Sequence, residues 1–185
     1  MADKKEKRYT FNTKLYEVCA DDELRPLMQC VHFVNGFAYA SNGYISIKQT
    51  LELQSCINKE LLDDKSMHRN SYRAIMAFEI AECTADGIYC KNTTGETAFF
   101  DYFDRKGDPI PNFEKAMAAH RGLTSLTFIG IDPELLNKLV KAIYNPSNQL
   151  RMQFTGIDSN IIIDAVGVDD QVAHLMPKII NATLF

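Results

Sequence analysis

The residues of this sequence that could carry catalysis or bind a metal are its histidines, cysteines and adjacent aspartates. The five cysteines are widely spaced, and none forms the Cys-x-x-Cys pair of a zinc or redox site. The sequence contains no glycine-rich phosphate loop, no His-Glu-x-x-His motif and no Gly-x-Ser-x-Gly motif. The histidines fall in different predicted elements and the aspartate pairs in predicted turns, loops or helix ends: His32, His68, His120, His174, Asp21–Asp22, Asp63–Asp64 and Asp169–Asp170. We therefore predict that the protein is not an enzyme and uses no cofactor and no metal.

Lysine and arginine form the second group of interest, because they bind phosphates. The chain has 20 basic and 24 acidic residues and a formal net charge of −4, so no general attraction to nucleic acid is expected. A local basic face is still compatible with that balance. The basic residues in question lie in the two predicted helices: Lys65, His68, Arg69, Arg73, Lys138 and Lys141. They could contact DNA or be ordinary solvated residues. Asp63 and Asp64 reduce the net positive charge of the first group.

The cysteines also indicate the compartment. An odd number of widely spaced cysteines is typical of reduced thiols, here expected in the core. The charged N-terminus is not followed by an apolar stretch, and no apolar run approaches the roughly 20 residues of a membrane helix. We predict a cytoplasmic protein with no membrane association. Hydrophobic residues make up 46% of the 185 residues, which is enough for a full core.

The first half of the chain is predicted to form short strands followed by a helix and three more strands. Strands are expected over 8–18, 27–34, 37–41 and 44–48, a helix with a break near Ser66 over 58–77, and strands over 78–83, 87–91 and 97–103. Asn35-Gly36 and Asn42-Gly43 mark tight turns, because both residue types tolerate positive φ.

The last third repeats this order. A strand over 125–131 precedes a helix over 133–144, for which Asp132 is a good N-cap and Pro133 a good first residue. Strands follow over 150–155, 161–166 and 171–176. The sequence predicts an α+β fold of repeated β-α-β-β-β units, with antiparallel sheets and two main helices. We expect a charged tail (1–7) and two subdomains (8–107 and 108–185) in one compact unit.

Several strings, in the order of these elements, resemble the bacterial DNA polymerase sliding clamp. They are Arg25-Pro26, Asn35 to Gly43, Ile110 to Phe113, Ile131 to Ile143, Leu150 to Phe154 and His174 to Ile179. The resemblance covers most of residues 8–180 and implies a clamp-like fold. The chain is about half the length of a bacterial clamp protomer, and it contains nearer one and a half clamp domains than one or two.

The resemblance implies a DNA-binding role for the helices, because clamp helices line the DNA channel. A sliding contact must be strong and indifferent to sequence, which favours basic side chains against phosphates. The residues expected to contact double-stranded DNA are Lys65, Arg69, Arg73, Lys138 and Lys141. A ring would require several copies of this chain joined edge to edge, so a homo-oligomer is expected.

The resemblance also implies a partner site, because the last Met-Pro strand of a clamp borders a groove that captures peptides. Leu175, Met176 and Pro177 match that strand, and a flexible methionine suits promiscuous binding. Leu184 and Phe185 resemble the Leu-Phe end of clamp-binding peptides and could dock in such a groove. The plainer alternatives are that Leu175 and Met176 are core residues and that the C-terminal residues form a last strand.

Three hypotheses follow. The first is a clamp-like factor of DNA replication or repair that binds DNA and a DNA polymerase or another clamp. The second is a clamp-fold interaction module or decoy that does not bind DNA. The third is an enzyme or small-molecule binder on an unrelated α+β fold.

Overall fold

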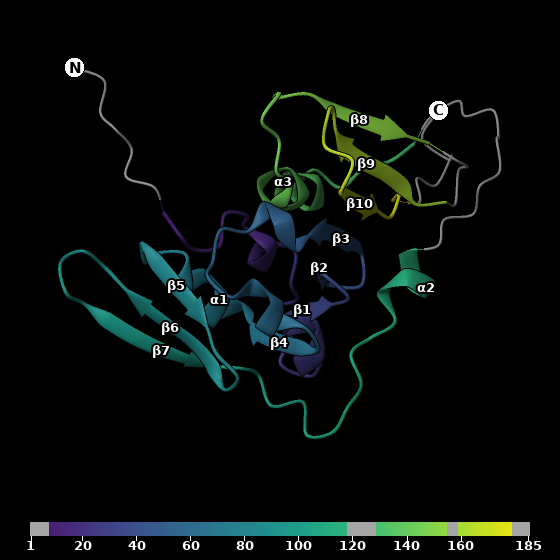
Figure 1. The fold of residues 1–185 in the computed structure, drawn as a ribbon. Coiled ribbons are helices and arrows are strands. Elements are labelled where there is room, and N and C mark those ends of the chain that lie inside the picture. Colours follow the sequence, from purple (N-terminus) through teal and green to yellow (C-terminus); the bar gives the residue numbers. More distant parts are fainter. Residues whose placement is uncertain (1–7, 118–128, 155–158, 179–185) are drawn as a thin grey trace, which may run out of the picture.

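The computed structural model of the protein describes residues 8–117, 129–154 and 159–178. These residues form two antiparallel sheets with helices packed against them (Figure 1). The seven-stranded sheet has the order β4-β1-β2-β3-β10-β9-β8. Its strands are β1 (Cys30–Val34), β2 (Phe37–Ser41), β3 (Ile45–Thr50), β4 (Lys65–His68), β8 (Leu150–Gln153), β9 (Ile161–Ala165) and β10 (Gln171–Leu175). The three-stranded sheet contains β5 (Ile80–Cys83), β6 (Gly87–Lys91) and β7 (Thr97–Asp101), and the helices are α1 (Arg69–Ile75), α2 (Phe113–Met117) and α3 (Pro133–Ala142).

Asn-Gly turns join the first three strands of the large sheet. Asn35 and Gly36 both have positive φ, 50° and 78°, as a two-residue hairpin of the right twist requires. Gly43, with φ of 92°, lies in the turn between β2 and β3. The predicted antiparallel meander of β1, β2 and β3 is confirmed.

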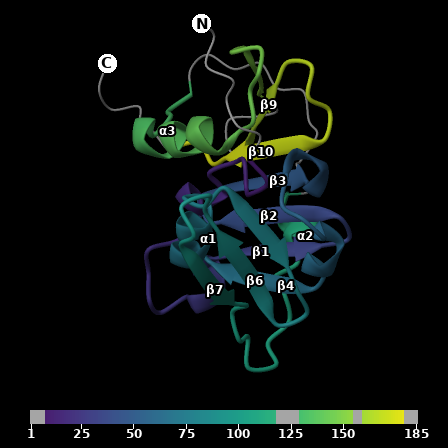
Figure 2. The same cartoon turned by 60° about the vertical axis from the view of Figure 1, so that its left-hand side comes forward.

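The seven-stranded sheet has two different faces, because successive side chains of a strand point to opposite sides. One side, the helix face, carries buried residues such as Phe33 and Ile47, and both α1 and α3 pack on it (Figure 2). The other side, the outer face, carries Tyr39, which packs with Phe113 of the short helix α2. The two main helices therefore pack on the same side of a continuous sheet.

A single-turn 3-10 helix, η1 (Leu15–Glu17), contacts both α1 and α3 on the helix face. Its buried Leu15 joins the common core. Just before η1, the ring of Phe11 stacks on Tyr72 of α1 with centroids 4.3 Å apart. Aromatic stacking adds roughly 1 kcal/mol to the burial of the two rings, so this contact ties the N-terminal segment to α1.

The two parts of the large sheet meet at β3 and β10. Gln49 and Gln171 are directly opposite in this pair, and both are buried. Gln49 Nε2 donates to Gln171 Oε1 (2.8 Å) and to the carbonyl of Ala142 at the end of α3 (3.0 Å). Gln171 also bonds both backbone groups of Tyr144. The amides thus fix the end of α3 on the strand junction.

The structure corrects two predicted elements. The strand predicted over 8–18 is wrong, because only Tyr9 forms a bridge, to Ile80, before η1 begins. The helix predicted over 58–77 is wrong in its first part, where a 3-10 helix (Lys59–Leu62) and the edge strand β4 precede α1.

The other predicted strands and the helix over 133–144 are confirmed, most of them one to three residues shorter than expected. Of the strand predicted over 125–131, residues 125–128 lie outside the described residues, as does the predicted tail over 1–7; Gly130 pairs with Lys178. Within the described ranges, no helix has the length and apolar character needed to cross a membrane.

Replacing Gln171 by leucine tests the buried amide junction. The change removes the hydrogen-bond partner of the Tyr144 N–H, of the Tyr144 C=O and of the Gln49 amide. Each buried polar group left without a hydrogen bond lowers the stability of the fold by about 1–3 kcal/mol. We expect Gln171→Leu to lower the free energy of unfolding by roughly 2–4 kcal/mol, measured by urea denaturation. The exposed Gln149→Leu is the control and is expected within about 0.5 kcal/mol of the parent; an equal loss in both variants would contradict this role.

Candidate functional site

Three of the five predicted DNA contacts lie on the two main helices without a neutralising partner that the structure describes. Arg73 of α1 is exposed, with its guanidinium carbon 5.8 Å from the ring centre of Tyr16. Lys141 of α3 is exposed and Lys138 is partly buried one turn before it. All three belong to the layer that covers the helix face (Figure 2). The structure thus brings basic residues from distant parts of the sequence onto one side.

The other two predicted contacts have partners within the protein. Arg69, at the start of α1, forms an ion pair with Asp21 and donates to the carbonyl of Ala20 at 3.1 Å. Lys65 lies in the edge strand β4 rather than in a helix, and its Nζ is 5.2 Å from the ring centre of Tyr102. Arg69 therefore anchors the loop before β1, and its charge is largely compensated.

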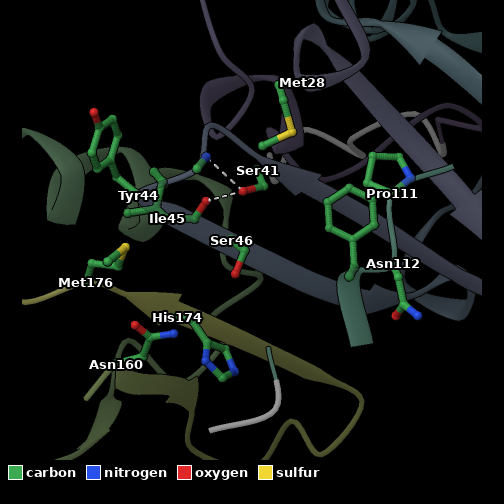
Figure 3. Close-up of a pocket in the computed structure, with 12 residues that line it drawn as sticks. Met28, Ser41, Tyr44, Ile45, Ser46, Pro111, Asn112, Asn160, His174 and Met176 are labelled. Carbon is green, nitrogen blue, oxygen red and sulfur yellow. Dashed lines mark hydrogen bonds between the residues drawn. The ribbon is translucent and has the colours of Figure 1, made fainter. Parts of the chain in front are cut away.

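One of the predicted partner residues, Met176, lines a hollow on the outer face, and Figure 3 shows this lining. The hollow encloses about 190 Å³. Met176, which is 47% exposed, lies at its rim immediately after β10, and its N–H donates to the carbonyl of Tyr44 at 3.0 Å. Tyr44 follows the turn between β2 and β3. The junction of β3 and β10 therefore positions both residues of this wall.

Leu175 does not line the hollow, because strand alternation points it to the helix face, where it is fully buried in the core. The alternative that Leu175 is a core residue is therefore correct, whereas Met176 is a surface residue. Pro177 follows Met176 but does not line the hollow. The predicted Leu184 and Phe185 lie outside the described residues.

His174 gives the hollow a polar wall. It lies on β10, is only 5% exposed, and lines the hollow together with Asn160 and Ser46 (Figure 3). Burial lowers its pKa, so the ring is neutral at pH 7. Its Nδ1 has no hydrogen-bond partner among the described residues. A buried ring nitrogen without a partner is available to a bound ligand.

The other wall is a segment that we call the strap, residues 110–115, which crosses the outer face. Phe113 stacks on Tyr39 with ring centroids 5.2 Å apart and lies 5.4 Å from His32. Glu114 accepts hydrogen bonds from Lys48 Nζ (2.5 Å) and from the hydroxyl of Tyr39 (2.6 Å). Both hydrogen bonds lower the pKa of Glu114, and the bond from Lys48 has the larger effect. One aromatic ring and one carboxylate therefore hold the strap.

A second hollow lies on the far side of the strap. It encloses about 360 Å³ and is lined by Phe37, Tyr39 and Phe113, among others. Pro111, Asn112 and Phe113 line both hollows, so the strap lies between them. His32 supports the floor through contacts to Ser66 Oγ (2.8 Å) and the carbonyl of Leu27 (2.7 Å), and burial lowers its pKa to about 4.

The cysteines and acidic residues contribute no metal centre in the parts of the chain that the structure describes. All five cysteines are buried free thiols. Burial raises the pKa of Cys30 and of Cys90 to about 12, so neither is a thiolate near neutral pH. Such thiols pack as small apolar groups.

Sequence reasoning missed Tyr44, His174 and the strap as parts of the site. They come from a turn, a strand and a loop far apart in the sequence, and only the strand junction brings them together. The available signals were the Ile110 to Phe113 and His174 to Ile179 strings, which the sequence analysis noted for their resemblance; it gave neither His174 nor the strap a role in binding.

Comparisons with known proteins identify the fold. No protein-family model and no curated protein matches the sequence. Solved structures of bacterial sliding clamps do match. The DNA polymerase III subunit beta of Pseudomonas aeruginosa has a TM-score of 0.61 at 12% identity, covering 91% of this chain and 62% of that one. The sliding clamp of Bartonella birtlesii, bound to griselimycin, has a TM-score of 0.59 at 11% identity, covering 90% and 63%. The subunit beta of Thermotoga maritima has a TM-score of 0.58 at 8% identity, covering 91% and 63%.

This protein therefore has the fold of the bacterial DNA polymerase sliding clamp, as its sequence predicted. The similarity extends over about 90% of the chain. At these identities it shows the fold alone. The chain spans 62–63% of the length of the clamps that it matches.

Loosening the strap is expected to expose it to protease. Phe113→Ala removes the stacking on Tyr39, and Glu114→Gln removes the charged partner of Lys48. We expect trypsin to cut after Lys115 at least several-fold faster in both variants than in the parent. Mass spectrometry of the fragments over time measures the cleavage rate. Cleavage after Lys91, in β6 of the other sheet, is the internal control and should not change. Equal acceleration at both sites would indicate general unfolding and contradict a local role.

Proposed function

We propose that this protein is a clamp-like factor that acts in the cytoplasm without catalysis, associating with double-stranded DNA through its helix face and with a replication protein through its outer face. The observation that carries the proposal is that α1 and α3 pack on the same side of a continuous sheet, with Arg73 and Lys141 exposed on them. The clamp fold of the chain supports it. The subdomains 8–107 and 108–185 would be parts of one homo-oligomeric clamp-like assembly.

The charges favour contact with the phosphate backbone over reading of bases. Arg73, Lys138 and Lys141 are spread over two helices and not gathered on one recognition element. Phosphate contacts from several elements position a protein on duplex DNA without specifying a sequence. Because the net charge of the chain is −4, we expect any attraction to DNA to be confined to the helix face.

The outer-face hollow is proposed to hold a short segment of a DNA polymerase or of another clamp-binding protein. Met176 offers an adaptable apolar rim, and His174 offers a buried polar atom beside it. A peptide with a large apolar side chain next to a hydrogen-bonding group fits both features. Leu184 and Phe185 of this chain, or the same residues of another copy, are one candidate ligand.

A second candidate function is a clamp-fold interaction module that does not bind DNA. The observation that favours it is that Arg69 and Lys65, two of the five predicted DNA contacts, are engaged within the protein. Under this alternative the hollow at Met176 would be the functional site. Measurement of DNA binding separates the two functions.

The DNA-binding proposal predicts steep salt dependence. Affinity for duplex DNA should fall as salt rises, because each phosphate contact releases condensed counterions. The triple variant Arg73→Gln, Lys138→Gln, Lys141→Gln should reduce the slope of log K against log salt by about 2–3, since each contact contributes roughly 0.9. Fluorescence anisotropy with a labelled duplex measures both values.

The matched control neutralises three exposed lysines elsewhere in the chain: Lys91→Gln, Lys115→Gln and Lys178→Gln. None of them lies on α1 or α3, and the change in net charge is the same. A loss equal to that of the helix variant would mean that only net charge matters. No binding by the parent at low salt would remove the first function and leave the second.

The partner-site proposal predicts that a labelled peptide of residues 180–185 binds the hollow. Met176→Glu places a charge at the apolar rim and should weaken binding at least tenfold, or about 1.4 kcal/mol. Tyr89→Glu on the three-stranded sheet is the control, because Tyr89 is similarly exposed (40%). If the chain's own tail competes, deletion of Leu184 and Phe185 should strengthen peptide binding. Equal affinities of both glutamate variants would rule out this site.

A further inference from the structure

The three-stranded sheet has one buried face and one exposed face. Its inward-pointing residues, such as Ala81 and Ile88, belong to the common core. The exposed side chains that point the other way are Glu82, Tyr89, Lys91, Thr97, Phe99 and Asp101. We call this second side the aromatic face. The sheet lies on the opposite side of the molecule from α2 (Figure 1), so the aromatic face is separate from the hollow at Met176.

Two aromatic side chains lie next to each other on the aromatic face. Strand pairing places Tyr89 directly opposite Phe99. The two residues are 40% and 49% exposed. Directly opposite residues of an antiparallel pair have Cβ atoms about 4.5–5.5 Å apart. The two rings therefore belong to one apolar patch, whereas single exposed apolar residues scattered over a surface need no explanation.

Gly87 determines where the ring of Phe99 lies. A Cβ atom at residue 87 would come within 2.7 Å of Cζ and 2.8 Å of Cε1 of Phe99, which is too close for carbon atoms that are not bonded. The ring of Phe99 thus occupies the space that any larger residue at position 87 would need. It lies against the backbone of β6 and is still half exposed. A ring held in place loses little conformational entropy when a ligand stacks on it.

Each ring has a carboxylate beside it. Glu82 lies directly opposite Tyr89, on the side away from Phe99. Asp101 lies two residues beyond Phe99 on the same side of β7, directly opposite Gly87. Because Gly87 has no side chain, the ring of Phe99 and the carboxylate of Asp101 border the same open position. The aromatic face therefore offers two pairs of one ring and one carboxylate.

These carboxylates are not neutralised within the part of the chain that the structure describes. No ion pair there involves Glu82 or Asp101, and Glu82 accepts only a long hydrogen bond of 3.4 Å from Asn58 Nδ2. Asp86, in the turn before β6, is also exposed. Lys91 is the basic residue among the exposed side chains of the aromatic face. The face is thus negatively charged, most of all at the end that carries Asp86 and Asp101.

We propose that the aromatic face binds an arginine-containing segment of a partner protein, with one guanidinium stacked on Phe99 and paired with Asp101. A guanidinium is planar, stacks on aromatic rings and forms two parallel hydrogen bonds with a carboxylate. A cation is also attracted to the face of an aromatic ring. Arginine is therefore the side chain that uses both neighbours at once. Tyr89 and Glu82 offer the same combination to a second arginine one strand away.

Charge distinguishes this ligand from a nucleic acid. Exposed rings on a sheet also stack on the bases of single strands. A nucleic acid would bring one phosphate for each nucleotide to a face that carries Glu82, Asp101 and Asp86 against Lys91 alone. The charges therefore favour a cationic ligand. The inference does not depend on the proposed function, because the aromatic face shares no residue with α1, α3 or the hollow at Met176.

Peptide binding to the full chain tests the proposal. The probe is a fluorescein-labelled peptide of sequence Gly-Arg-Gly-Arg-Gly, compared by fluorescence anisotropy with Gly-Lys-Gly-Lys-Gly of the same charge. We expect the arginine peptide to bind about fivefold more tightly, because lysine lacks the planar fork. Phe99→Leu, which keeps an apolar side chain next to Gly87, and Asp101→Asn should each raise its dissociation constant by about fivefold.

Matched controls come from other parts of the chain. Phe154→Leu removes a ring that is 37% exposed after β8, and Asp108→Asn removes an exposed carboxylate outside the two sheets. Both should leave the dissociation constant unchanged. Thermal melts monitored by circular dichroism verify that all variants are folded.

Lys91→Gln tests the sign of the ligand's charge. Removing this cation should tighten binding of the arginine peptide by about twofold, because it removes a like charge from the face. An anionic ligand would be bound more weakly instead. A labelled single-stranded oligothymidylate is the anionic probe, and we expect no binding of it that Phe99→Leu reduces.

Several outcomes would overturn the proposal. They are equal affinities for the two peptides, equal losses in the control variants, and weaker binding of the arginine peptide by Lys91→Gln. Binding of the oligothymidylate that is lost in Phe99→Leu would assign the aromatic face to single-stranded nucleic acid.

Discussion

The pairing of β3 with β10 is the constraint on which the rest of this molecule depends. It joins strands from the first and last thirds of the chain, and the buried Gln49 and Gln171 lie opposite each other within it. A shift of one residue would turn every side chain of β10 to the other face. The same register binds the end of α3 through Ala142 and Tyr144. The register of this one strand pair therefore determines where α3 ends on the sheet and which side chains of β10 reach the outer face.

The two faces carry different side chains because of strand alternation. On β10, Leu175 points into the core beneath the helices, whereas His174 points to the outer-face hollow. Met176 continues beyond the strand and is held to Tyr44 by a backbone hydrogen bond. Basic helices and the hollow at Met176 are thus placed on opposite sides of the same sheet. Under the proposed function, DNA and a partner protein would therefore contact different sides of the molecule.

Local patterns predicted most of the elements and the fold, whereas the site depends on contacts between distant segments. The Asn35-Gly36 turn and the capped helix at Asp132 carry their own signals, and both formed where expected. The helix predicted over 58–77 failed in its first part because Lys65–His68 gains more from pairing with β1 than from continuing a helix. Arg69 was correctly placed on a helix, but nothing in its sequence neighbourhood indicated that Asp21 would pair with it.

The two walls of the hollow differ in how firmly they are held. The wall at Met176 is anchored by the β3–β10 ladder and by buried amides, and breaking it would disrupt the whole sheet. The strap is held mainly by one stacked ring, Phe113, and by the exposed carboxylate of Glu114. An exposed ion pair contributes at most about 1 kcal/mol, so the strap can move at a much lower cost than the opposite wall. In the proposed partner site, Met176 and His174 would therefore stay in place while the strap adjusts to the shape of the bound segment.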